Sequence, residues 1–149
     1  MAEALQPAGG DRLGAHRLGV RVYYEDTDAG GIVYHANYLR FAERARTEMM
    51  RHHGPSHAEM IATAGVAFAV RRCAVEYLRP ARLDDWLEVE SVVMGVGAAT
   101  LDLRQTVRRG AETLTELDVR LVCIDTAGRP ARLPPPVRAA LTTLLQSRD

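Results

Sequence analysis

The stretch YYEDTDAGGIVYHANYLRFAERARTEMMRHHG, residues 23 to 54, joins a polar turn to an amphipathic segment. Within that segment, apolar side chains recur at spacings of three and four and so share one face: Tyr38, Ala42, Ala45 and Met49. Charged side chains occupy the opposite face, and the Gly54-Pro55 pair ends the pattern. The sequence therefore predicts a helix of about four turns over residues 37 to 53.

The segments on either side of this helix have the pattern of strands. Residues 17 to 24 alternate between apolar and polar side chains, which is typical of a half-buried strand. Further strands are predicted at about 66–78, 86–95, 98–109 and 112–125. Their connections, RPARLDD, GVG and RRGAE, are short and can join only antiparallel neighbours. Shorter helices are expected at 56–65, after a Ser56/Glu59 capping box, and at about 136–146.

These elements predict one α+β domain over residues 16–149, preceded by a flexible tail at 1–15. A single long helix covers only one face of such a sheet. Cys73, Tyr77 and Trp86, together with several valines, are too apolar for an opposite face in water. We therefore expect a homo-oligomer in which another subunit covers that face. Because Cys73 and Cys123 lie in apolar strands without metal-ligand spacing, both are predicted to be buried free thiols in a reducing compartment.

Composition narrows the class of protein. The formal net charge is zero, which argues against a nucleic-acid binder that works through a broad basic field. No apolar run reaches the roughly 20 residues of a membrane-spanning helix. The first residues lack the basic start and apolar segment of a signal peptide, so a cytoplasmic location is expected.

The motif DTDAGGIVYH, residues 26 to 35, is compatible with several kinds of chemistry. A phosphatase-type aspartate pair would follow an apolar strand, whereas YYE precedes it here. The sequence argues against a metal shared by His35 and the histidines at 52, 53 and 57, since a helix of this length separates them by roughly 24 Å. That histidine group is instead expected to be a solvated helix end.

The start of the helix offers a third interpretation of the motif. Gly30 and Gly31 permit a tight turn, and the N–H groups of residues 34 to 36 lack helical partners. Such donors can stabilise an oxyanion, with Asp28 as the attacking or water-activating carboxylate. In the structural alternative Asp28 only caps the turn, and the local pattern alone favours that alternative.

A family resemblance extends beyond the motif. The opening stretch and the later VAFAVRRCAVEYLRPARLDDWLEVE closely resemble the hotdog-fold acyl-CoA thioesterases of the 4-hydroxybenzoyl-CoA thioesterase class. The likeness runs from about residue 17 to 146 and is strongest with the bacterial branch associated with the Tol-Pal system. It implies a long helix wrapped by a five- or six-stranded antiparallel sheet. It also implies active sites at a dimer interface, and dimers that pair into homotetramers.

The resemblance also assigns roles to residues. It places the catalytic carboxylate on Asp28 and the oxyanion donor on the backbone N–H of His35, with Tyr24 and the His35 side chain accompanying them. Asp26 is expected to support the turn. The residues expected to bind substrate are Gly31, Val33, Tyr34, Arg71, Arg79 and Arg82. The arginines suit the phosphates of coenzyme A, although they could equally line a solvated strand edge. No metal or other cofactor is implied.

The resemblance sets the expected substrate and partners as well. An acyl-CoA thioester is the expected substrate, and acyl carrier protein or enzymes of phospholipid synthesis are candidate partners, in the cytoplasm or at the inner membrane. Two alternatives remain open. One is a hotdog hydratase or dehydratase, and the other is an acyl-carrier or envelope-complex binding module with a vestigial site.

Overall fold

The computed structural model describes residues 14–147. The expected tail over residues 1–15 falls outside them except at its last two residues, and Ala15 already belongs to a strand. The strands are β1 (Ala15–Arg21), β2 (Ala67–Tyr77), β3 (Trp86–Val96), β4 (Thr100–Arg109) and β5 (Glu112–Ile124). The helices are α1 (Asn37–His53), α2 (His57–Ala64) and α3 (Pro135–Ser147).

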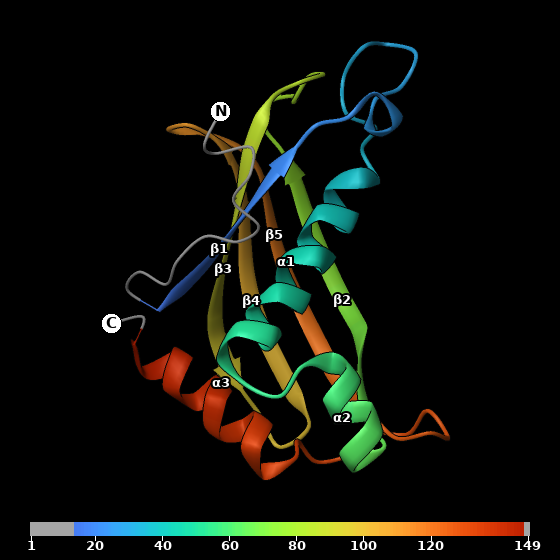
Figure 1. Cartoon of the computed structure of the whole chain (residues 1–149), viewed down its shortest axis with the longest axis vertical. Helices are drawn as coiled ribbons and strands as arrows, with labels where there is room; N and C mark the ends of the chain where they lie inside the picture. The colour runs from blue at the N-terminus through green and yellow to red at the C-terminus, as the bar shows by residue number, and fades with distance from the viewer. Residues whose placement is uncertain (1–13, 148–149) are drawn as a thin grey trace.

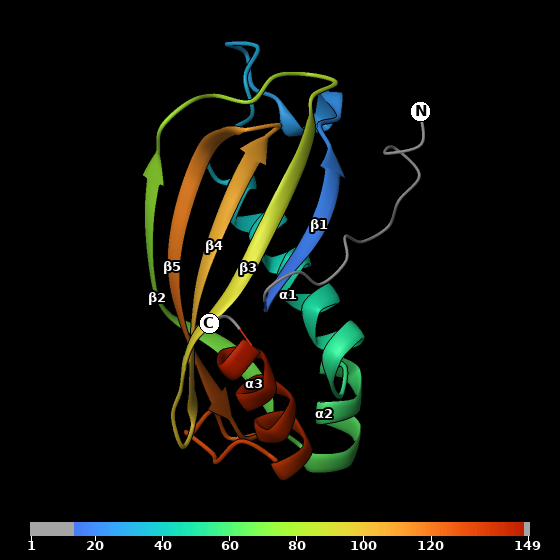
Figure 2. The same cartoon turned by 90° about the vertical axis from the view of Figure 1, so that its left-hand side faces the viewer.

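The five strands form one antiparallel sheet in the order β1-β3-β4-β5-β2. The sheet curves around α1, which lies along its inner face between the two edge strands, while α2 and α3 lie toward one end (Figures 1 and 2). The apolar stripe of α1 packs into the core as predicted, and the α+β arrangement is confirmed. No helix in the described part of the chain is long and apolar enough to cross a membrane.

The chain leaves the sheet earlier than the alternation predicted. β1 ends at Arg21, and Tyr24–Asp26 form a single 3-10 turn instead of continuing the strand. The Asp26 carboxylate accepts the Tyr23 N–H at 2.8 Å, which captures a donor that a longer strand would have used. Tyr24 is therefore 83% exposed rather than on the buried face of a strand.

The outer face of the sheet is polar, contrary to expectation. Arginine and carboxylate side chains pair across neighbouring strands: Arg120 with Asp102 at 2.7 Å, Arg104 with Asp118 at 2.8 Å, and Arg17 with Glu90 at 2.8 Å. This face can therefore remain in water, and the predicted oligomer cannot be argued from it.

Two of the residues that had predicted an apolar outer face, Cys73 and Tyr77, lie instead on the inner face of β2. Cys73 is opposite the buried Val119, and Tyr77 is opposite the buried Thr115. Because β2 is an edge strand that α1 does not fully cover, Cys73 is exposed, and the prediction of two buried thiols is wrong for it. Cys123 is buried as predicted, and both cysteines are free.

The histidines at the C-terminal end of α1 and just beyond it are less solvated than predicted. His16 of β1 is fully buried, and its ring lies 5.9 Å from those of His52 and His53. His53 and His57 are half-buried, and only His52 is exposed. Within the described residues, no group of three or more His, Cys, Asp or Glu side chains could hold a metal ion.

Candidate active site

The loop between the 3-10 turn and α1 is a tight, well-fastened turn. Gly31 donates its N–H to the Asp28 carbonyl at 3.0 Å and has a φ of +81°, which favours glycine. Val33 donates to the Ala81 carbonyl at 2.9 Å, and a β-bridge pairs Ile32 with Arg82. The loop is thus anchored to the segment between β2 and β3.

Asp26 has the supporting role that was predicted. Its carbonyl accepts the Tyr34 N–H at 2.9 Å and the Asn37 side-chain amide at 2.8 Å, while its carboxylate holds Tyr23. These bonds fix the approach of the loop to α1. They also use the Tyr34 N–H, so the open donors expected over residues 34 to 36 reduce to those of His35 and Ala36. Neither of these N–H groups has an acceptor among the described residues.

Asp28 caps the turn, as the structural alternative required. Its Oδ1 accepts the Gly30 N–H at 2.8 Å, and the carboxylate is exposed. The other oxygen, Oδ2, has no hydrogen bond among the described residues. Capping through one oxygen therefore leaves the second able to meet a water molecule or a carbonyl carbon.

Aromatic side chains surround the start of α1. The Tyr77 hydroxyl donates to the His35 carbonyl at 3.0 Å, and the ring of Tyr77 packs edge-on against His35 and Tyr38. The Tyr34 ring lies 4.7 Å from the His35 ring. Burial raises the pKa of Tyr77, so it remains a neutral donor. Sequence reasoning did not assign Tyr77 to the site, although the alternation CAVEY puts it on the same face as Cys73.

The other predicted site residues are distributed unevenly around this turn. Val33 is 2% exposed and belongs to the core, so its side chain is not available to a substrate in the single chain. Gly31 and Tyr34 lie within the motif and are exposed. The Tyr24 side chain forms no hydrogen bond with Asp28 and no ring contact with His35 among the described residues, and the Tyr24 carbonyl accepts the Thr27 hydroxyl.

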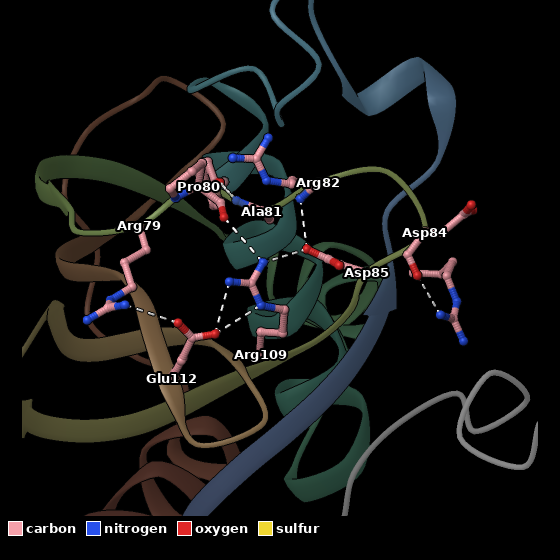
Figure 3. A network of polar contacts seen from close by, with 10 residues as sticks. Arg79, Pro80, Ala81, Arg82, Asp84, Asp85, Arg109 and Glu112 are labelled. Atoms are coloured by element: carbon pink, nitrogen blue, oxygen red, sulfur yellow. Dashed lines mark hydrogen bonds and ion pairs between the residues drawn. The ribbon is translucent and has the colours of Figure 1, made fainter.

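The predicted phosphate-binding arginines have different surroundings. Arg79 is paired with Glu112 at 3.2 Å, while Arg109, which the sequence analysis missed, bridges Glu112 and Asp85 (Figure 3). The Arg82 backbone N–H binds Asp85, but its guanidinium points away from this network (Figure 3) and forms no ion pair among the described residues. The exposed Arg71 lies at a bulge of β2, six residues before Tyr77.

Comparison with known proteins places this geometry in a family. The model of the thioesterase-like superfamily matches residues 22–141, and the chain belongs to this family. The chain is 51% identical over 110 residues to an acyl-CoA thioester hydrolase, YbgC, of Escherichia coli O157:H7, covering 73% of this chain and 81% of the relative. It is 43% identical over 122 residues to the acyl-CoA thioesterase YbgC of Haemophilus influenzae, covering 81% and 90%.

The solved structures agree with the sequence relatives. A probable thioesterase from Bartonella henselae superimposes with a TM-score of 0.78 at 33% identity, covering 80% of this chain and 99% of that one. The expectations of a hotdog fold and of a thioesterase are therefore confirmed.

Proposed function

We propose that this protein hydrolyses acyl-CoA thioesters to a free acid and coenzyme A at the turn before α1. The observation that carries the proposal is the pair of open N–H groups at His35 and Ala36, next to a carboxylate with one free oxygen. Relatives that are named acyl-CoA thioester hydrolases support the choice of substrate.

The proposed reaction uses this chain's own groups. The thioester carbonyl oxygen accepts hydrogen bonds from the N–H groups of His35 and Ala36, which stabilise the negative charge that develops on it. Asp28 either removes a proton from the attacking water or attacks the carbonyl carbon itself to form a mixed anhydride. The carbon–sulfur bond then breaks, and the thiolate of coenzyme A leaves and takes up a proton. We assign Tyr24 and the His35 imidazole to orienting the carboxylate and the leaving group.

The turn itself provides a clean test of Asp28. In Asp28→Asn the amide oxygen can still accept the Gly30 N–H, so the turn should persist while the basic oxygen is lost. We expect kcat to fall by about 10²- to 10⁴-fold with an unchanged melting temperature. The measurement is thiol release from purified protein, and wild-type turnover in the variant would contradict the assignment.

Isotope labelling can identify the nucleophilic route. A single turnover in ¹⁸O-water puts the label into the acid product if Asp28 acts as a base. If Asp28 is the nucleophile and water opens the anhydride at the Asp28 carbonyl carbon, the first turnover labels the Asp28 carboxylate instead, which mass spectrometry of the peptide detects. Attack of water on the acyl carbon labels the acid in both routes, so label in Asp28 is the diagnostic result.

We further propose that a second copy completes the site through β2. β2 is an edge strand, and three apolar side chains beside the site are well exposed in the single chain: Tyr34 at 47%, Val70 at 52% and Tyr77 at 46%. Pairing two β2 strands would continue the sheet and cover these side chains. The polar outer face of the sheet favours a further pairing of dimers into a tetramer less than the exposed apolar side chains of the inner face favour the dimer. The dimer is therefore the unit proposed for catalysis.

The place of the enzyme in the cell belongs to the same proposal. We assign it to the cytoplasm or the inner face of the inner membrane, with acyl carrier protein or phospholipid-synthesis enzymes as partners. A binding module with a vestigial site remains the second candidate, because Asp28 caps its turn whether or not it reacts. Tight capture of acyl carrier protein with negligible thiol release on every acyl thioester would favour that candidate.

A further inference from the structure

A charged side chain lies within the apolar stripe of α1. Arg46 is 8% exposed, while the rest of the buried face of the helix consists of apolar residues and Tyr38. Among the described residues no carboxylate lies within ion-pair distance of its guanidinium. Burial lowers the pKa of Arg46, although the nearby Glu43 partly opposes this shift. An arginine buried without a carboxylate is unfavourable for stability, which suggests that the position serves another purpose.

The guanidinium is held in place by a polar row that crosses the sheet. Gln105 of β4 is fully buried, and its Oε1 accepts from Arg46 Nη1 at 3.0 Å. Its Nε2 donates to the Ala42 carbonyl and to Ser91 Oγ, each at 2.9 Å. Because both ends of the Gln105 amide are engaged, the amide orientation is fixed, and Arg46 retains donors that Gln105 does not use.

The position of Gln105 also locates the guanidinium along the helix. Since Gln105 contacts both Arg46 and the Ala42 carbonyl, the charged group lies near the level of Ala42. That level is five residues from Asn37, the first residue of α1, or about 8 Å along the helix axis. Along the helix axis, the charge is therefore offset from the start of α1, beside the open N–H groups, by roughly the length of a small acyl group.

A cavity connects Arg46 with the inner face of β2. It has a volume of about 720 Å³ and borders α1, and Arg46 lines it with Thr47, His57, Phe68 and Val70. Val70 shares the inner face of β2 with Tyr77, which hydrogen-bonds to the His35 carbonyl. The inner face of β2 thus runs from the start of α1 toward Arg46. Burial and then the charge of Arg46 lower the pKa of His57, so that this neighbour is neutral at neutral pH. Arg21 and Arg44 also line the cavity, but Arg46 is the buried cation among the three.

We propose that Arg46 is a specificity-determining residue that donates hydrogen bonds to an oxygen on the acyl group, such as a hydroxyl, a phenol or a second carboxylate. This inference rests on the proposed thioesterase function and adds the class of acyl group. A plain alkyl chain beside Arg46 would leave the guanidinium donors that Gln105 does not use without an acceptor in a dehydrated site, whereas an oxygen would supply one. The enzyme should therefore prefer acyl groups with an oxygen near their far end over alkyl groups of equal length.

A matched pair of substrates tests this preference. Adipoyl-CoA carries a terminal carboxylate, and hexanoyl-CoA has the same chain without it. We expect the wild type to show the higher kcat/KM with adipoyl-CoA, and Arg46→Met to lower the ratio of the two kcat/KM values by about tenfold or more. Arg46→Lys should restore part of the ratio because it restores the charge. Arg40→Met, on an exposed position of the same helix, should leave it unchanged.

Several outcomes would overturn the inference. They are a wild type without the preference, an unchanged ratio in Arg46→Met, or an equal loss on both substrates. Dissociation of an oligomer in Arg46→Met would mean that the Arg46 guanidinium forms an ion pair with a carboxylate of a second copy instead of binding the acyl group. If Arg46→Met does not fold, Arg46→Gln removes the charge while retaining a hydrogen bond to Gln105, and the same ratio decides.

Binding experiments separate this inference from the proposed function. The probe is a thioether analogue of adipoyl-CoA that cannot be hydrolysed, titrated by calorimetry into the wild type and Arg46→Met. If neither thioester is hydrolysed but the analogue binds at least about tenfold more weakly to Arg46→Met, the acyl subsite stands and the thioesterase proposal fails. If both thioesters are hydrolysed and the analogue binds equally well to the wild type and to Arg46→Met, the thioesterase proposal stands and the acyl subsite fails.

Discussion

Asp26 and Asp28 are the same residue type two positions apart, and their hydrogen bonds separate their roles. Asp26 is 9% exposed and uses its carbonyl and carboxylate to fasten Tyr23, Tyr34 and Asn37. Asp28 is exposed and uses one oxygen on Gly30. Each carboxylate thus accepts one hydrogen bond, and exposure separates the two: the buried Asp26 supports the loop, whereas the exposed Asp28 has an oxygen that a substrate can reach.

The two arginines of the 78–85 segment differ in ion pairing, since Arg79 is paired with Glu112 and Arg82 has no ion pair among the described residues, which gives a prediction. Arg82→Ala should raise the KM for acyl-CoA by about tenfold with little change in kcat, because a phosphate contact contributes to binding before chemistry. Arg79→Ala is the matched control and should have a smaller effect, since Glu112 already holds that guanidinium. Steady-state kinetics measures both.

A second substrate completes the test of Arg82. The same acyl group on a short thiol lacks the nucleotide phosphates, so its KM should not respond to Arg82→Ala. An equal rise in KM on both substrates would contradict phosphate binding and point to a disturbed loop.

At the scale of single elements, local patterns determine some boundaries and long-range contacts determine others. α1 spans the predicted residues 37 to 53 because its periodicity and the Gly54-Pro55 end are local features. β1 ends at Arg21, short of the predicted boundary, because the Asp26 side chain captures the chain. The α2 capping box is confirmed, with Ser56 Oγ accepting the Glu59 N–H at 3.1 Å.

The candidate site could be predicted only in part, for the same physical reason. Asp28 and His35 could be proposed because the turn and helix start are contiguous in sequence. Tyr77 and Gln105 reach their partners through strand register and the packing of α1, and a single sequence does not specify either. Local composition also gave no sign that Arg79 would be paired with Glu112 rather than free.

The packing of α2 against α1 and β2 predicts a pH dependence. Burial, followed by the charge of Arg46, holds the pKa of His57 below its ordinary value of 6.5 in the folded state. The unfolded chain therefore binds more protons, so the stability contributed by neutral His57 is complete above 6.5 and is lost as the pH falls toward the folded pKa. The hydrogen bond from Arg120 lowers the pKa of Asp102. Protonation of Asp102 therefore changes the stability only at pH values below its ordinary pKa of 3.8.

Chemical denaturation at about pH 7.5 and about pH 5.5 measures this effect. The free energy of unfolding of the wild type should decrease between the two, and His57→Gln should show a smaller decrease. His52→Gln changes an exposed ring and serves as the control. An equal decrease in the free energy of unfolding for the wild type and His57→Gln would assign the pH dependence to other groups.

At the scale of the whole molecule, the two faces of the sheet expose different kinds of side chain. The outer face is covered by paired charges, whereas the inner face of β2 leaves apolar side chains and the Cys73 thiol exposed. Monomeric proteins seldom leave such a strip open along an edge strand. The asymmetry directs the proposed assembly to β2 and away from the outer face.

The Cys73 thiol reports on that assembly. If two copies pair through β2, Cys73 should react slowly with a thiol reagent at high protein concentration and faster on dilution, with a mass that changes in parallel by light scattering. Cys123 is buried within the chain and should stay slow throughout. Fast labelling at every concentration would rule out a dimer through this strand, and Cys73→Ser identifies which thiol reacts.

The bond from Gln105 to the Ala42 carbonyl has a consequence for how selectivity can arise. Most helices rest on a sheet through apolar contacts that tolerate some sliding, but here a buried amide bonds to the helix backbone itself. Moving α1 along its axis would break that bond and the one from Arg46 to Gln105 in the same step. The sheet therefore fixes α1 along its axis. The distance between the proposed oxyanion site at the start of the helix and the Arg46 guanidinium stays constant and does not adjust to the ligand.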